Sequence, residues 1–146
     1  MSILGSNGSP ASAHRSRGQA LVEFALVLPL FLLLLAGMVD FGLGLNASIT
    51  VTNAAREGAR LGTTKPIASA IDARSRAMAA GLDASKVNVV SSCKRPTGST
   101  PATCTLGTWQ SGDSVVVTVT YEYKMIWPLA MGNIINMAST TEMRLE

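Results

Sequence analysis

A long stretch without charge near the N-terminus, residues 24–39, constrains this chain more than any other feature. Counted from residue 20, the apolar segment reaches 20 positions, the length at which an α-helix crosses the hydrocarbon core of a bilayer. Basic side chains, which stay on the cytoplasmic side of a membrane, come before it: His14, Arg15 and Arg17. The chain is therefore expected to cross a membrane once, with its N-terminus in the cytoplasm and the remainder outside.

The rest of the composition allows one small domain. About 100 residues follow the first 45, enough for a single domain with a core of marginal size. Residues 1–18 are rich in Ser, Gly and Ala and predict a disordered leader. From Gln19 onward ten basic side chains oppose nine acidic ones, and a balance this even argues against nucleic acid as a partner. We expect a leader over 1–18, a transmembrane helix over 19–45 and an extracytoplasmic domain over 46–146.

Sequence patterns predict an α+β fold for this chain. A first helix is expected from Gln19 to near Gly62, with a kink at Pro29 because proline lacks the amide hydrogen. A second helix is expected from Pro66 to about Leu82. Alternating side chains predict about three antiparallel strands, at Lys86–Val90, Ser114–Tyr123 and Thr140–Leu145. Helices followed by strands favour α+β over a wound parallel sheet.

Small residues recur every four positions towards the end of the first helix. Ala54, Gly58 and Gly62 share one face, which lets another backbone approach closely. The occupant of this face is either the domain's own sheet, which we favour, or a neighbouring copy of the chain. Glu57 and Arg60, three residues apart, stand at the spacing of helical neighbours.

The chain has two cysteines, Cys93 and Cys104, which bracket a loop rich in Pro, Gly, Ser and Thr. An even count outside the cytoplasm favours a disulfide over two unpaired thiols. A loop of this length would contribute about 3 kcal/mol in the chain-entropy description. A metal site is not expected, because no CxxC occurs and the single histidine precedes the membrane segment.

An apolar segment, Met125–Gly132, separates the last two expected strands. It is too short to span a membrane and is interrupted by Pro128. We expect it to plug the core as a loop or short helix, with part of it exposed near the membrane surface. A fully exposed version would be a docking patch.

Three features of residues 18–62 resemble the TadE-like family of the tight-adherence (Tad/Flp) branch of type IV pilus systems. The first is the run Gly18 to Phe24, which resembles the glycine, four residues, glutamate, aromatic pattern of prepilin processing sites. The second is the apolar run with Pro29 inside it. The third is the segment from Ala54 to Arg60, which is similar to one that follows the membrane helix in that family.

The resemblance implies a pilin-like fold and a role as a minor pseudopilin in pilus biogenesis and adherence. A prepilin peptidase would cut between Gly18 and Gln19, with Glu23 and Phe24 as parts of its motif. The mature protein would wait in the bacterial inner membrane for other pilins or minor pseudopilins and for the assembly platform with its ATPase. The domain after Gly62 favours a minor subunit, since the bulk pilins of this branch are much shorter.

Glu23 also has a physical role in this interpretation. Helices packed in a filament would bury both the new α-amino group of Gln19 and the carboxylate of Glu23. Each charge alone would be costly in a dry core, and pairing the amine of one subunit with the carboxylate of the next offsets much of that cost. The same pair would set the vertical register between subunits.

Two other interpretations account for the apolar run. In one, it is a secretory signal peptide cut on the outer face, although it is long for that role and Ala36-Gly37-Met38 is a poor cleavage site. In the other, a plain bitopic anchor carries an extracytoplasmic binding or adhesion domain unrelated to pili. Glu23 would then merely reach the membrane interface.

An enzyme is the class that the sequence supports least. No histidine lies in the part expected outside the membrane, so the commonest general base is missing there. A Ser-x-x-Lys stretch ending at Lys94 has neither the Ser-Asp-Asn nor the Lys-Thr-Gly companion of serine β-lactamases. We expect no catalytic residue and no cofactor.

Overall fold

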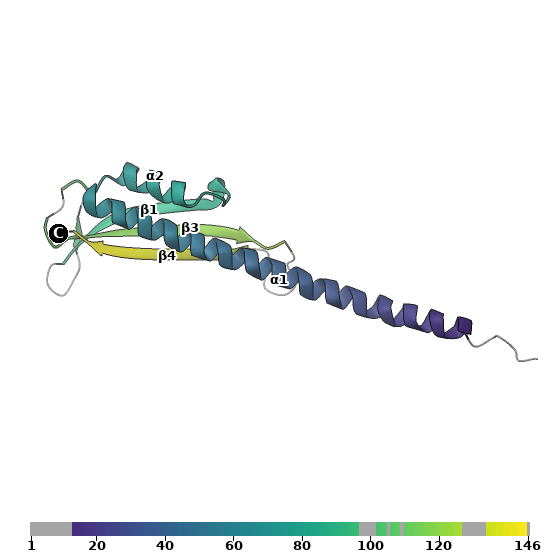
Figure 1. Cartoon of the computed structure of the whole chain (residues 1–146). Coiled ribbons are helices and arrows are strands. Elements are labelled where there is room, and N and C mark those ends of the chain that lie inside the picture. The colour runs from purple at the N-terminus through teal and green to yellow at the C-terminus, as the bar shows by residue number, and fades with distance from the viewer. Residues whose placement is uncertain (1–12, 97–101, 105, 109, 127–133, 146) are drawn as a thin grey trace, which may run out of the picture. The chain divides into compact units, whose positions relative to one another are not determined.

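The computed structural model describes residues 13–96, 102–104, 106–108, 110–126 and 134–145, with the side chains of 13–17 and 102–104 left outside that description. The chain divides into two compact units, residues 1–39 and residues 40–146. One helix, α1 (Ala13–Thr64), contributes to both units (Figure 1). Because the second unit begins at Asp40, α1 supplies the first unit and the opening helix of the second.

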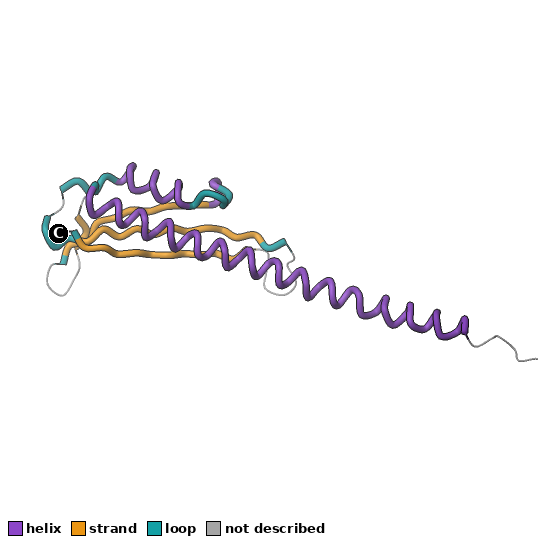
Figure 2. Tube along the Cα trace, viewed as in Figure 1, coloured by secondary structure: helices purple, strands orange, loops and turns teal. Residues whose placement is uncertain are grey.

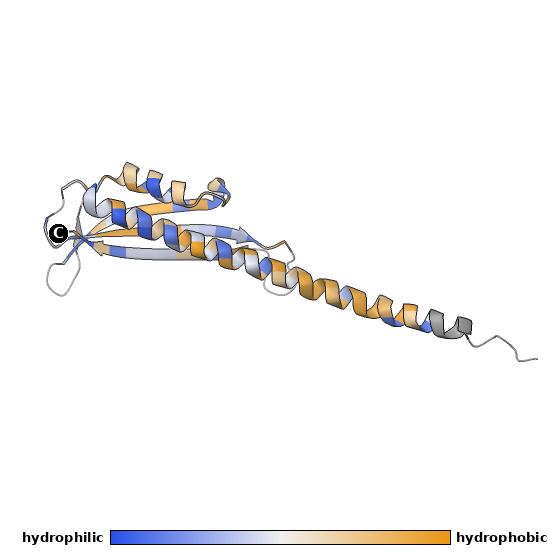
Figure 3. Cartoon of the chain, viewed as in Figure 1, coloured by the Kyte–Doolittle hydropathy of each residue, from blue (hydrophilic) through white to orange (hydrophobic). Residues whose placement is uncertain are grey.

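The described part of the first unit is a single helix, largely apolar. The large apolar side chains between residues 21 and 39 are 37–74% exposed, and Figure 3 shows this part of α1 as mostly hydrophobic. Of the described residues, one helix, Gly18–Thr64, is long and apolar enough to cross a membrane. Exposed apolar surface on this scale needs a lipid or protein cover. The helix therefore suggests a single-pass membrane anchor.

The helix begins earlier than the sequence pattern indicated. Residues 13–18 are helical in the structure, whereas we expected them to belong to a disordered leader. That expectation was wrong for these residues, because a helix that already exists can be extended at little cost, and no proline or glycine lies between Ala13 and Arg17. Residues 1–12 lie outside the described residues. The helix also continues through Pro29.

The second unit is an α+β domain, as predicted. After α1 come α2 (Ala68–Met78), a 3-10 turn η1 (Ala84–Lys86), β1 (Val87–Arg95), β2 (Ala102–Cys104), β3 (Ser114–Lys124) and β4 (Ile134–Arg144). The strands form one antiparallel sheet in the order β2-β1-β3-β4. Figure 2 shows both helices on the same side of this sheet. The three long strands confirm the prediction of about three; the three-residue β2 was not predicted.

The core lies between the sheet and α1. Along β3, alternate side chains at positions 115, 117 and 119 are fully buried, as the period of two predicted. The small residues of α1 and Val51 pack above them, with Ile71 of α2. Leu145, just after β4, is 1% exposed and completes this cluster. The core therefore joins the C-terminal half of α1 to the middle of the sheet.

Several boundaries differ from the expected ones. The second helix ends at Met78 rather than near Leu82, and Gly81 adopts a positive φ of 99° in the turn that follows. β1 extends to Arg95, and β4 begins at Ile134 rather than Thr140, because pairing with β3 organises residues whose own pattern does not alternate. In the segment predicted as a plug, Met125 is half-buried and Ile126 is 60% exposed, and residues 127–132 lie outside the described residues.

Candidate functional site

The residues of the expected processing motif lie together on the first turns of the apolar helix. Gly18 would meet nothing within 4 Å if it carried a Cβ atom, and Phe24 is 62% exposed. Gln19 Nε2 donates a hydrogen bond of 3.2 Å to Glu23 Oε1 one turn away. The motif is thus open on the helix surface, and its carboxylate is bound to the residue that would become the new N-terminus.

The small-residue face of α1 is occupied within the chain. A Cβ atom on Gly58 would collide with Ser75 Oγ of α2, and one on Gly62 would lie 2.7 Å from Val115 Cγ1 of β3. Ala54 is fully buried. Glycine is favoured at these two points because the side chains of α2 and β3 leave no room for a methyl group. The face that the sequence singled out therefore contacts the chain's own sheet and second helix.

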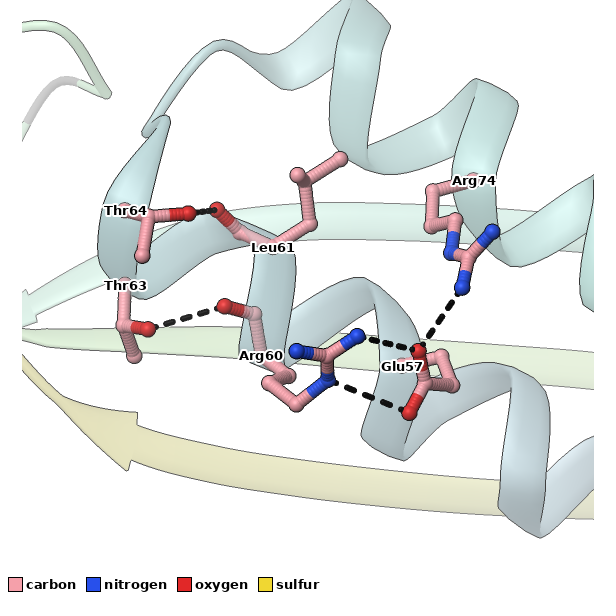
Figure 4. A network of polar contacts seen from close by, with 6 residues as sticks. All are labelled: Glu57, Arg60, Leu61, Thr63, Thr64 and Arg74. Atoms are coloured by element: carbon pink, nitrogen blue, oxygen red, sulfur yellow. Dashed lines mark hydrogen bonds and ion pairs between the residues drawn. The ribbon is translucent and has the colours of Figure 1, made fainter.

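A carboxylate on α1 ties the two helices of the domain together (Figure 4). Glu57 accepts hydrogen bonds from Arg60 on the same helix, at 3.2 and 3.0 Å, and from Arg74 of α2 at 3.0 Å. The hydrogen bonds from Arg60 and Arg74 hold the pKa of Glu57 below its usual range. Glu57 and Arg60 thus form the contact that their spacing on a helix predicted. No sequence pattern indicated that Arg74 of the second helix would bind the same carboxylate.

Asp40, the first residue of the second unit, is tied to the end of β3 and to the residues that follow it. Its carboxylate accepts hydrogen bonds from the Tyr123 hydroxyl at 3.2 Å and from the Ile126 amide at 3.0 Å. Asp40 is 8% exposed. Burial, followed by the adjoining Asp40 carboxylate, raises the pKa of Tyr123. The sequence pattern did not reveal these contacts, because the partners of Asp40 lie more than 80 residues away.

Asp113 holds the opposite end of the sheet. It receives two hydrogen bonds from Arg95 at 3.0 and 2.9 Å and one from the Gln110 amide at 2.8 Å. Its backbone carbonyl accepts from the amide of Leu145 at 2.7 Å. The Arg95 bonds lower the pKa of the Asp113 carboxyl. This buried acid, which the sequence pattern did not single out, fastens β1, β3 and the C-terminal segment to one another.

The two cysteines occupy opposite positions on neighbouring strands. Cys93 of β1 is disulfide-bonded and 2% exposed, and Cys104 of β2 is its register partner. The side chain of Cys104 lies outside the described residues. Within the described ranges, no group of three or more His, Cys, Asp or Glu side chains is placed to hold a metal ion.

A comparison with known protein families finds a match in the N-terminal part of the chain, which includes the expected processing motif. A family model described as TadE-like protein matches residues 18–60. These residues are TadE-like. The resemblance inferred from the sequence is confirmed over this segment, which begins at Gly18 and ends at Arg60. Neither a curated protein nor a solved structure matches the chain.

The TadE-like segment suggests a protein associated with Tad pili. It contains the whole apolar helix, the glutamate of the expected processing motif and Glu57 of the helix-to-helix network. The sheet and α2 lie beyond the match. The likeness therefore covers the apolar helix and its continuation and ends before α2 and the sheet.

Proposed function

We propose that this chain is a minor pseudopilin of a Tad/Flp-type pilus, made as a precursor and cut after Gly18 by a prepilin peptidase. The observation that carries the proposal is the TadE-like match, which starts at Gly18 and runs through the exposed apolar helix. In this proposal residues 1–18 are a leader, 19–45 form the transmembrane helix in the inner membrane, and 46–146 form the extracytoplasmic domain.

Cleavage requires the bond between Gly18 and Gln19 to leave the helix. Both residues lie within α1, whose helical backbone is too compact for an extended peptidase cleft. Glycine lowers the cost of unwinding by roughly 0.5–1 kcal/mol relative to alanine. Nothing lies within 4 Å of the position of a Gly18 Cβ, so a peptidase can approach without displacing any described residue.

Glu23 then serves assembly. Cleavage converts Gln19 into a chain end whose α-amino group carries positive charge. Gln19 lies one turn from Glu23, and their side chains already contact each other within one chain. In a bundle of such helices the carboxylate pairs with the amine of a neighbouring subunit, which offsets the cost of burying both charges. The partners of the mature protein are thus other pilins or minor pseudopilins and the membrane platform with its ATPase.

The proposal includes a covalent link between Cys93 and Cys104. The register brings the two residues opposite each other on antiparallel strands, where the Cα separation suits a disulfide. Such a link holds the short β2 to the sheet and requires an oxidising compartment. It is therefore consistent with a domain outside the cytoplasm.

The test follows processing and assembly in the native host with single substitutions. Gly18→Leu is expected to retain the leader, whereas Gly37→Leu, at another uncrowded glycine of the same helix, is expected to be cut normally. Electrophoretic mobility of the membrane-bound chain reports the difference. Normal cleavage of Gly18→Leu would overturn the peptidase assignment and leave the plain bitopic anchor, with a binding domain unrelated to pili, as the alternative.

A further inference from the structure

The sheet ends in a long strand with a free edge. β4 is the last strand in the order β2-β1-β3-β4 and pairs with β3 through eleven consecutive register positions, from Ile134 to Arg144. Among the described residues, nothing pairs with its other side. At the opposite end of the sheet the three-residue β2 pairs with positions 93–95 of β1. β4 therefore presents a row of unpaired backbone donors and acceptors about 37 Å long.

This edge lacks the features that normally protect one. Residues 134–141 contain no charged side chain, no proline and no glycine, and the register with β3 shows no bulge. The charged residues of the strand stand near its end. Of these, Glu142 is paired with Lys94 at 3.0 Å, and Arg144 is exposed and forms no ion pair within the described residues. An edge of this kind is suited to accepting another strand.

The side chains of β4 that face the helices are incompletely covered. On the central strand β3, the corresponding positions 115, 117 and 119 are fully buried. On β4 the same face carries only half-buried side chains: Met137, Ser139, Thr141 and Met143. A further strand beside β4 would complete their cover, and methionine adapts easily to the shape of a partner.

The direction of β4 restricts what that strand can be. Asp40, at the start of the second unit, bonds Tyr123, which pairs with Ile135 near the start of β4. At the other end of β3, Val115 contacts Gly62 and pairs with Met143. β4 therefore runs away from the end at which α1 enters the domain. Two copies joined antiparallel through β4 would have their α1 helices enter from opposite ends, which two chains anchored alike in one membrane cannot do.

We infer that the free edge of β4 binds an extended segment of a different polypeptide, which adds as an antiparallel fifth strand. The segment is uncharged over its middle, to match residues 134–141, and carries a carboxylate where it passes Arg144. Antiparallel addition is favoured because its hydrogen bonds are straighter than those of parallel pairs. This interaction belongs to the second unit and goes beyond the proposed function, since it does not depend on cleavage at Gly18.

The test places a photo-crosslinking amino acid at Ala138 of the full chain in native membranes. The matched control is Thr120, the register partner of Ala138 on the central strand, where both neighbouring positions are already filled. The expected result is a crosslink from position 138 to a different protein, identified by mass spectrometry, and loss of that product at position 120. A product containing only two copies of this chain, or equal yields at the two positions, would overturn the inference.

A pair of proline variants separates edge binding from folding. Adjacent residues of an antiparallel strand direct their N–H groups to opposite sides. One of Thr140→Pro and Thr141→Pro therefore removes a bond to β3, and the other removes a donor from the free edge. The edge-directed variant, recognised by the smaller shift in urea midpoint, is expected to lose the crosslink from position 138. Retention of the crosslink in that variant would contradict strand addition.

Discussion

The two parts of α1, before and after residue 40, differ in the size and exposure of their side chains. Before residue 40 the helix carries large apolar side chains that no described part of the chain covers. After residue 40 its face towards the sheet is mostly small, with Ala54, Ala55 and Ala59 all fully buried beside the larger Val51. Large exposed residues suit lipid or neighbouring helices, whereas small buried ones allow close contact within the domain. The fully buried small residues of α1 thus all lie in the part of the helix that follows Asp40, although Phe41 and Ile49 are still exposed.

The largest effect is expected from filling the small-residue face. Gly58→Leu should destabilise the domain by about 3 kcal/mol, because the side chain would displace Ser75 and Val117. Gly42→Leu is the matched control, since a Cβ atom there meets nothing within 4 Å. Urea unfolding of the full chains, followed by circular dichroism, gives the comparison. Equal midpoints for the two variants would show that the close packing at Gly58 is not required.

The two glutamates of α1 are expected to separate assembly from stability. Glu23→Gln should remain in the membrane with an unchanged domain midpoint, yet fail to enter pilus assemblies, because it cannot pair with a neighbouring α-amino group. Glu57→Gln should assemble and lower the urea midpoint slightly, since it weakens the bonds from Arg60 and Arg74. Sheared surface fractions and urea titrations measure the two effects. Assembly of Glu23→Gln at the level of the unmodified chain would refute the pairing.

The domain is expected to lose stability in acid. Arg95 holds the folded-state pKa of Asp113 below its unfolded value, and Arg60 does the same for Glu57. Stability from such groups is fully present above the unfolded pKa values, about 4, and is lost as the pH falls towards the folded ones. Urea midpoints should thus be steady from pH 7 to about 5 and decline below about 4. The urea midpoint of Asp113→Asn should fall less between about pH 5 and about pH 3 than that of the unmodified chain. An equal fall in the two proteins would contradict the contribution of the Asp113 carboxylate to stability.

The smallest effect is expected from removing the hydrogen bond between Tyr123 and Asp40. Tyr123→Phe removes the hydroxyl that donates to Asp40 and should cost about 1 kcal/mol, while the Ile126 amide remains bonded to the same carboxylate. Differential scanning calorimetry of the purified chain measures the change. Replacing Tyr121, which donates no hydrogen bond to Asp40, would lose packing instead. An unchanged transition temperature for Tyr123→Phe would show that this bond adds nothing.

The sequence predicted those parts of the molecule that depend on local patterns. Alternation along residues 114–121 revealed β3 and its buried side, and four-residue spacing revealed the face containing Gly58. Contacts between distant residues were missed, because no local pattern encodes them. Asp40 with Tyr123 and Asp113 with Arg95 are separated by 83 and 18 positions. β2 was missed because a strand of three residues is too short to show an alternating pattern of side chains.

The motif at residues 18–24 illustrates the same limit in the candidate site. Its residue types and its place before an apolar helix were readable, and the TadE-like match covers it. Its chemistry, however, involves a peptidase and neighbouring subunits, and the fold of a single chain contains neither. The hydrogen bond between Gln19 and Glu23 is the only contact that one chain can supply towards that chemistry among the described residues.

The most direct test of the account is the mature N-terminus of the chain recovered from its native membrane, measured by mass spectrometry. The account predicts a chain that begins at Gln19. A chain that still begins at Met1, or at any residue before Gly18, would contradict peptidase processing and indicate a plain membrane anchor. A chain that begins after Val39 would instead show a secreted domain, and the role proposed for Glu23 would be wrong.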